Sequence, residues 1–353
     1  MKDIRHITDS ELVSFLESIK EKPFRAKQIS EWLWKKGVRS FDEMSNLSTS
    51  LCTALAAQFS FQTTDIEEEV KAGDGTVKFV FRLYDGQKVE GVLIPSAGRT
   101  TACISSQVGC PLRCAFCATG TMGFVRQLHY SEIFDQYMLI NQKSLAYMGK
   151  PLSNIVYMGM GEPLLNYDQV MRSVEVLTAP WGQSLSPSRI TLSTAGVAPA
   201  IKRLADDGFK AGLAVSLHCA DELKRAQLMP VTELHPLKTL QEALSYYHSK
   251  TNERITIEYL LLNGLNDSTE DARKLWEFCK PFPVKINIIE YNATGGKFSP
   301  SPAYRLEAFV NYLTAKNMVV NIRRSKGKDA QAACGQLVQK KRKAENGKLK
   351  SEN

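Results

Sequence analysis

The sequence predicts an α/β fold whose core is a parallel sheet. From about residue 100, short β-rich runs alternate with amphipathic helical stretches, and repeated strand–helix units imply right-handed crossovers between parallel strands. The chain has 353 residues, of which 43% are hydrophobic, so it can bury a large core. Such a sheet is either open or curved into a barrel. The predicted strands are 101–104, 155–158, 190–193, 213–217, 255–259 and 284–289.

Two smaller units precede this sheet. The first sixty residues predict a helical module, in which Ser10 can cap the first helix and a second helix over 24–37 ends at Gly37. A third helix is expected over 47–59. A strand pair then follows, "TVKFVFRL" and "KVEGVLIP", joined through an Asp-Gly turn.

The formal net charge of +8 gathers near the two ends of the chain. Residues 20–40 hold seven Lys or Arg against two Glu, and residues 340–353 hold six against two. Such runs are either solvated or contact nucleic-acid phosphates, and charge alone leaves both open. No apolar run approaches the roughly 18 residues of a membrane span. Because the start is also polar, we expect a cytoplasmic protein that does not contact a membrane.

Four of the eight cysteines lie within the fifteen positions 103–117. Cys110, Cys114 and Cys117 form a C-x3-C-x2-C pattern that directly follows the first predicted strand. In a reducing compartment such clusters are typically metal ligands or redox groups. A structural zinc site needs four ligands, and neither a second pair nor a nearby histidine completes one. Three thiolates instead suit a [4Fe-4S] cluster whose fourth iron stays open to a small molecule.

Small and polar residues stand where several predicted strands end. In "MGMGEP", Gly159 and Gly161 allow close approach of backbone to a ligand, and Glu162 offers a carboxylate to an ammonium group. Each signal is weak alone, because glycine-rich turns and structural histidines are common. Together they predict one cofactor pocket at the carboxyl ends of the strands. Its other members are Ser193, Ser216, Leu217, His218 and Asn292.

The cysteine spacing, with Phe116 inside it, resembles the radical S-adenosylmethionine (SAM) superfamily. The resemblance implies a partial (β/α)6 barrel. It also implies that the open iron binds the amino and carboxylate groups of SAM. An electron from the cluster then cleaves SAM to a 5′-deoxyadenosyl radical.

Further motifs resemble the RlmN-type RNA methyltransferases. "GVLIP", "CISSQVGCPLRCAFCATGTMGF", "VYMGMGEPLLN", "LSTAGV", "EYLLLNGLND" and "AACGQL" occur in that family's order, and the match extends from residue 24 to 337. The resemblance implies methylation of C2 of adenosine in 23S rRNA and in tRNA at position 37. The reaction is expected to pass through a methyl-cysteine and to use two SAM molecules per turnover.

The same resemblance assigns three catalytic residues. Cys334 accepts a methyl group from one SAM as a thiolate nucleophile, and Glu90 later takes the C2 proton. Cys103 then forms a transient disulfide with Cys334, which releases the product. From the residues alone, Cys334 could equally be a buried structural cysteine, and Glu90 a solvent-facing strand residue. The remaining cysteines are interpreted as structural: Cys52, Cys219 and Cys279.

Two alternatives remain open on these grounds. A Cfr-type enzyme would use the same mechanism to methylate C8 of adenosine, and a non-enzymatic RNA-binding protein with a metal-stabilised loop would suit the basic ends. The expected partners are structured RNA and a flavodoxin-like electron donor, and a monomer is expected. The predicted division is a helical RNA-binding accessory domain (1–60), a β-hairpin linker with Glu90 (61–98), a radical SAM partial barrel (99–338) and a basic, disordered tail (339–353).

Overall fold

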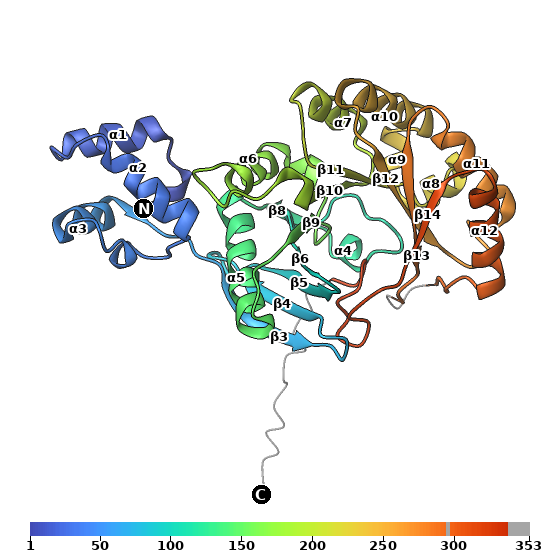
Figure 1. Cartoon of the computed structure of the whole chain (residues 1–353), viewed down its shortest axis with the longest axis horizontal. Coiled ribbons are helices and arrows are strands. Elements are labelled where there is room, and N and C mark those ends of the chain that lie inside the picture. Colours follow the sequence, from blue (N-terminus) through green and yellow to red (C-terminus); the bar gives the residue numbers. More distant parts are fainter. Residues whose placement is uncertain (294–296, 338–353) are drawn as a thin grey trace, which may run out of the picture.

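The computed structural model describes residues 1–293 and 297–337, so the predicted tail over 339–353 lies outside the described residues (Figure 1). One sheet of ten strands forms its core. Neighbouring strands are parallel from β6 to β14, and β5, β4 and β3 extend the sheet antiparallel. The spatial order is β14 (Val319–Arg323), β13 (Val284–Glu290), β12 (Ile255–Leu261), β11 (Gly212–Ser216), β10 (Ile190–Thr194), β9 (Asn154–Tyr157), β6 (Arg99–Cys103), β5 (Lys88–Ser96), β4 (Val77–Arg82) and β3 (Asp65–Lys71).

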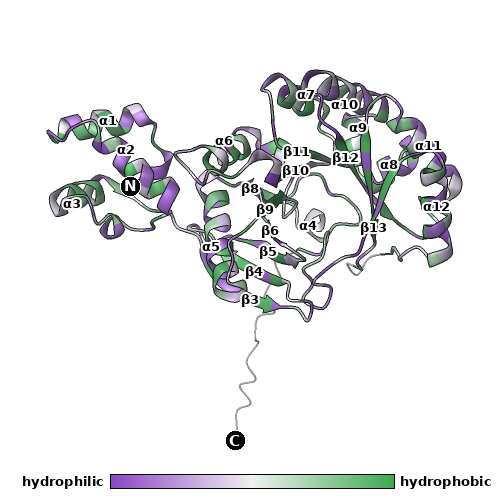
Figure 2. Ribbon diagram, in the orientation of Figure 1, coloured by the Kyte–Doolittle hydropathy of each residue, from purple (hydrophilic) through white to green (hydrophobic). Residues whose placement is uncertain are grey.

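The sheet curves around a short segment that carries α4 (Ala118–Thr121), and longer helices cover its outer side (Figure 1). The predicted parallel α/β sheet is therefore confirmed, in the form of a partial barrel. Its helices alternate between hydrophobic and hydrophilic residues, as expected where one helix face covers a sheet (Figure 2). The covering helices are α5 (Tyr130–Met148), α6 (Tyr167–Thr178), α7 (Ala198–Asp206), α8 (Glu222–Leu228), α9 (Val231–Leu234), α10 (Leu237–Thr251), α11 (Thr269–Cys279) and α12 (Ala303–Ala315).

The predicted strands are present, and the sequence missed those at the edges. β3 carries three glutamates, and most residues of β14 are exposed or half-buried. Edge strands bury little surface, so neither segment shows a continuous apolar run or a clean alternation. A small antiparallel ribbon, β7 (Gln107–Gly109) with β8 (Phe124–Gln127), was also missed, and it frames the cysteine loop.

The N-terminal helices form as predicted, with one correction at their start. Thr8, and not Ser10, caps the first helix, because its side chain accepts from the backbone N–H of Glu11 while the Glu11 carboxylate accepts from the N–H of Thr8. Gly37 ends the second helix in a left-handed conformation, as expected. These elements are β1 (Lys2–Asp3), a 3-10 turn (Ile4–His6), α1 (Asp9–Ser18), α2 (Arg25–Ser30), a π-helical turn (Glu31–Lys36), a 3-10 turn (Phe41–Glu43), α3 (Thr49–Gln58) and β2 (Phe59–Ser60).

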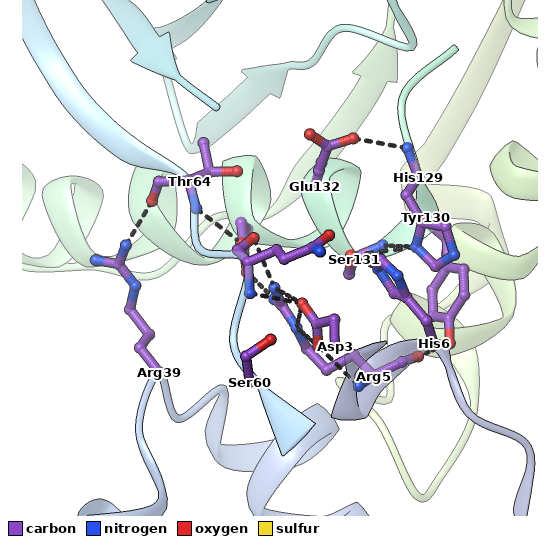
Figure 3. Close-up of polar contacts among 12 residues, drawn as sticks. Asp3, Arg5, His6, Arg39, Ser60, Thr64, His129, Tyr130, Ser131 and Glu132 are labelled. Atoms are coloured by element: carbon purple, nitrogen blue, oxygen red, sulfur yellow. Dashed lines mark hydrogen bonds and ion pairs between the residues drawn. The ribbon is translucent and has the colours of Figure 1, made fainter. Parts of the chain in front are cut away.

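A buried ionic joint fastens this helical region to the barrel (Figure 3). The Arg5 guanidinium lies 2.9 Å from the Asp3 carboxylate and 2.6 Å from that of Asp135 on α5, and all three side chains are buried. Asp135 also accepts from the backbone N–H of Thr64 at 3.2 Å. Beside the joint, the rings of His6 and His129 lie with their centroids 3.4 Å apart. Because buried charges are tolerated only when paired and hydrogen-bonded, this joint holds the helices in one orientation.

Among the residues that the structure describes, no helix has the length and apolar character required to cross a bilayer.

Replacing Arg5 by Met tests this joint. The substitution leaves the Asp3 and Asp135 carboxylates buried without their cation, which is expected to lower the free energy of unfolding by about 3–5 kcal/mol. Lys2→Ala is the matched control, because its pair with Glu11 is half exposed and its loss should cost about 1 kcal/mol or less. Denaturant titration of both variants measures the difference, and equal losses would contradict the assigned role of the joint.

Candidate active site

The loops at the carboxyl ends of the parallel strands enclose one cavity. Its empty volume is about 1010 Å³, a figure that includes the open mouth. The cysteine loop forms one wall, and the residues that follow β9, β10, β11 and β13 form the others. Of the predicted site residues, ten line this cavity: Cys110, Cys114, Cys117, Gly161, Glu162, Ser193, Ser216, His218, Asn292 and Cys334.

Backbone hydrogen bonds hold the cysteine loop in place. The N–H of Cys110 donates to the carbonyl of Gly123 at 2.9 Å, which closes the base of the loop. The N–H of Ala115 donates to the carbonyl of Leu228 at 2.9 Å, and that of Ala118 to Gly335 at 2.8 Å. The loop is therefore attached to α8 on one side and to the segment around Cys334 on the other.

The three thiols of the loop line the same cavity. Burial raises the pKa of Cys110 to about 12. Burial also raises the pKa of Cys114, and the neighbouring thiols of Cys117 and Cys110 raise it further. Within 1–293 and 297–337, no group of three or more Cys, His, Asp or Glu side chains is already gathered around a single metal position. The fit of the loop to an iron–sulfur cluster therefore rests on three soft donors that line one cavity.

Glu162 is a buried carboxylate that connects two of the loops. Its oxygens accept from the backbone N–H groups of Ala195 at 2.7 Å and Leu164 at 3.0 Å. Burial raises the pKa of Glu162 to about 7, against the effect of these hydrogen bonds. Near neutral pH, a cationic group placed in the cavity would favour the ionised form.

Steric contacts within the protein explain why residues 159 and 161, before Glu162, are glycines. A Cβ atom on Gly159 would lie 2.6 Å from the carbonyl oxygen of Ile104, and one on Gly161 would lie 2.5 Å from Cβ of Gln107. Gly161 also has a φ of +100°. Both glycines line the cavity, but the contacts that exclude a side chain are with residues 104–107, the chain that leads into the cysteine loop.

His218 is neutral and fixed. Its Nδ1 accepts from the backbone N–H of Leu260 at 3.1 Å, so the ring proton lies on Nε2. Burial lowers the pKa of His218 to about 3, and Arg225 lowers it further. The ring packs edge-to-face against Phe116 of the cysteine loop, with centroids 4.8 Å apart. His218 therefore presents an uncharged hydrogen-bond donor and supports the loop.

One buried oxygen atom in the wall, Asn292 Oδ1, has no polar partner within the described part of the chain. Glu258 Oε2 has no hydrogen bond there either, but it lies 3.6 Å from the Arg323 guanidinium, with which it forms an ion pair. The other atoms of these groups are engaged, since Asn292 Nδ2 donates to Ser325 at 2.9 Å and Glu258 Oε1 accepts from Asn287 at 2.9 Å. Unsatisfied buried acceptors that face a cavity fit a ligand rich in N–H and O–H groups. Sequence reasoning missed Glu258, although a charged residue inside "ITIEYLL" was a usable signal.

Cys334 lies close enough to Cys103 to raise the pKa of the Cys103 thiol, and both thiols raise the pKa of Arg323 on β14. Cys334 is exposed and lines the cavity, so the alternative of a buried structural cysteine is wrong. Burial raises the pKa of Cys103 to about 12, the Cys334 thiol raises it further, and Arg323 opposes the rise. Arg323 also pairs with Glu258 at 3.6 Å. Sequence reasoning missed Arg323 together with its strand, although Val319, Val320 and Ile322 were a usable strand signal.

The structure does not bring Glu90 into this cavity. Glu90 is buried and pairs with Lys78 of the neighbouring strand at 3.3 Å, so the solvent-facing alternative is wrong. It lines a second cavity, with an empty volume of about 2150 Å³. Residues that line the two cavities are close together in the sequence at two places. Gly109 and residues 330–331 line the second, whereas Cys110 and Cys334 line the first.

Other predicted residues lie away from the cavity wall. Leu217 is fully buried and does not line the cavity, and its carbonyl accepts from Arg225 at 3.0 Å. Cys219 and Cys279 are buried and Cys52 is half-buried, in keeping with structural positions.

Comparison with known proteins agrees with this architecture. Residues 2–60 match the ribosomal RNA large subunit methyltransferase N-terminal domain, and residues 104–275 match the radical SAM superfamily. The chain is 47% identical over 340 residues to the probable dual-specificity RNA methyltransferase RlmN of Christiangramia forsetii, covering 96% of this chain and 97% of that protein. It is 46% identical over 344 residues to the dual-specificity RNA methyltransferase RlmN of Oleidesulfovibrio alaskensis, covering 96% of each.

A solved structure of a radical SAM methyltransferase has the same fold. The crystal structure of a radical SAM methyltransferase from Sphaerobacter thermophilus superimposes with a TM-score of 0.89 at 36% identity, covering 96% of this chain and 99% of that one. Family membership implies that the protein uses an iron–sulfur cluster and SAM. With three cysteines in one loop, a strand-end cavity and near full-length similarity, the chain belongs to the RlmN family of radical SAM RNA methyltransferases.

Proposed function

We propose that this protein methylates C2 of adenosine in 23S rRNA and in tRNA at position 37, through a methyl-cysteine on Cys334 and with two SAM molecules per turnover. The observation that carries the proposal is the position of Cys334. Its exposed thiol lines the same cavity as the three thiols of the cysteine loop. One SAM-binding site can therefore serve both methyl transfer to sulfur and activation of the resulting methyl group.

The cofactors would be held by residues that line this cavity. Cys110, Cys114 and Cys117 would bind a [4Fe-4S] cluster, which supplies the electron that cleaves SAM to a carbon radical. Carboxylate, hydroxyl, imidazole and amide groups of the wall would orient SAM through its ammonium, carboxylate and ribose groups. The proposed SAM-binding residues are Gly161, Glu162, Ser193, Ser216, His218 and Asn292. Leu217, which the sequence pattern also predicts in the cofactor pocket, is fully buried and does not line the cavity.

Three residues of the chain would carry the remaining steps. The Cys334 sulfur accepts the methyl group as a thiolate nucleophile. Glu90 takes the C2 proton, and its carboxylate lies 3.3 Å from Lys78 on the neighbouring strand. Cys103 bonds to the Cys334 sulfur as the carbon–sulfur bond breaks. For Glu90 and Cys334 to reach one base, that base must enter where the two cavities adjoin.

The RNA partner requires a base to leave its stack to reach a buried site. Around such a site, shape and phosphate contacts matter more than a linear sequence code. Basic side chains of the N-terminal helices are proposed to contact phosphate. Lys27 and Lys35 are exposed, Arg25 is half-buried beside Glu21, and Lys36 lies over the ring of Trp32. The proposal also includes a cytoplasmic monomer that receives electrons from a flavodoxin-like donor.

Anaerobic reconstitution with iron and sulfide, followed by incubation with RNA and methyl-labelled SAM, tests this function. Label is expected at C2 of adenosine in both rRNA and tRNA fragments, mapped by nuclease digestion and mass spectrometry. Label at C8 would support the Cfr-type reaction instead. Zinc binding without SAM cleavage would support a non-enzymatic binding protein.

Cys103→Ala separates radical addition from product release. Without the resolving thiol, a covalent RNA–protein adduct through Cys334 is expected to accumulate, visible as a slower band on a denaturing gel. Cys52→Ala is the matched control, since Cys52 is half-buried in α3 and should leave turnover unchanged. Multiple turnover by Cys103→Ala would remove Cys103 from the reaction.

Charge reversal tests the phosphate contacts. Replacing Lys27 and Lys35 together by Glu should weaken RNA binding. It should also flatten the dependence of log K on log salt by roughly 0.7–0.9 for each lost contact. A double reversal of Lys202 and Lys210, which are exposed on the barrel, changes net charge equally and serves as the control. The same affinity and slope in both double variants would eliminate the N-terminal helices as the RNA-contacting surface.

A further inference from the structure

Arg225 is the largest of the fully buried side chains in the described part of the protein. It lies on α8, and its guanidinium donates three hydrogen bonds. Nε donates to the Leu217 carbonyl at 3.0 Å, Nη1 to the Thr232 hydroxyl at 2.8 Å and Nη2 to the Ala195 carbonyl at 2.7 Å. All three acceptors are neutral.

This arrangement differs from that of the other deeply buried arginine. Arg5 contacts two carboxylates, whereas none of the ion pairs among residues 1–293 and 297–337 includes Arg225. A guanidinium taken out of water without an anion costs several kcal/mol, and neutral acceptors recover only part of this. A fully buried, unpaired cation therefore indicates that its counter-anion is a bound group and not a side chain of the described residues.

The cysteine loop supplies the place for that anion. The N–H of Ala115, next to Cys114, donates to the carbonyl of Leu228 at the end of α8. Leu228 and Met229 pack in one buried cluster with Cys114 and Phe116. Burial lowers the pKa of Arg225 to about 10, and among the charges that oppose this shift Cys114 comes first, ahead of Glu222 and Cys219.

The position of Arg225 is also fixed. Its acceptor Ala195 donates its own N–H to Glu162, and its acceptor Leu217 precedes His218, so the guanidinium joins two loops of the cavity wall. A charge fixed in this way does not need to reorganise when the charge beside it changes.

We propose that Arg225 is the built-in counter-charge of the cluster bound at the cysteine loop and sets its reduction potential. The inference rests on the proposed cofactor. Thiolate ligands give the cluster negative charge, and reduction adds one more electron. A fixed cation nearby in a medium of low dielectric stabilises the reduced form more than the oxidised form, so Arg225 makes the potential less negative. Arg225 touches neither SAM nor RNA in this account and is a positioning residue.

Redox titration of the reconstituted protein, followed by the electron paramagnetic resonance (EPR) signal of the reduced cluster, tests the proposal without turnover. Arg225→Gln removes the charge and is expected to give a more negative midpoint potential. Arg225→Lys keeps the charge but loses the planar set of guanidinium donors, so its midpoint potential should remain near that of the unsubstituted protein. Lys224→Gln is the matched control, because this neighbouring cation already pairs with Asp271 at 2.6 Å and its removal should leave the potential unchanged.

An unchanged reduction potential in Arg225→Gln would overturn the proposal. Equal shifts of the potential in the Gln and Lys variants would also overturn it, because the loss of hydrogen bonds rather than of charge would then explain the shift. Should Arg225→Gln load the cluster poorly, thermal unfolding gives a second readout. Cluster loading should raise Tm more in the unsubstituted protein than in the variant, and equal rises count against the pairing. Failure of the proposed cofactor would be seen separately, as an unsubstituted protein that assembles no cluster.

Discussion

Parallel pairing of the strands from β6 to β14 is the constraint on which the rest of this structure depends. Because parallel strands all end at one edge, loops that are far apart in the sequence meet around a single cavity. The cysteine loop follows the first of these strands, and the segment with Cys334 follows the last. The two ends of the barrel sequence thus become adjacent walls of one site, joined by the hydrogen bond from Ala118 to Gly335.

Three buried charged groups of this protein have different kinds of partner. At the N-terminal joint, Arg5 is neutralised by two carboxylates, which suits a rigid structural contact. On the hairpin strands, Lys78 and Glu90 neutralise each other where both line the second cavity. At the cysteine loop, the three hydrogen-bond acceptors of Arg225 within the described residues are neutral. Because an unpaired buried cation is costly, the proposed anionic cofactor would supply its counter-charge.

Sequence reasoning succeeded where one local pattern carries the information. Apolar runs predicted the central strands, and the spacing of Cys110, Cys114 and Cys117 predicted three thiols that the structure places at one cavity. It failed at one local detail and where contacts join distant segments. Thr8, and not Ser10, caps the first helix, because Thr8 and Glu11 form a reciprocal pair of hydrogen bonds. Glu90 is buried and pairs with Lys78 across the strand pair, a contact that the alternation within its own strand did not predict. Arg323 lies on an edge strand that was not predicted, although Val319, Val320 and Ile322 of that strand are residues typical of strands.

The central claim is that the three-cysteine loop holds a four-iron cluster with one iron left open for SAM. EPR spectra of the reduced, anaerobically reconstituted protein, recorded before and after adding SAM, test it most directly, because direct coordination perturbs the signal of the open iron. The account predicts a [4Fe-4S] spectrum that SAM alters, together with about four irons per chain. A spectrum indifferent to SAM, or a single fully ligated zinc ion in place of the cluster, would contradict it.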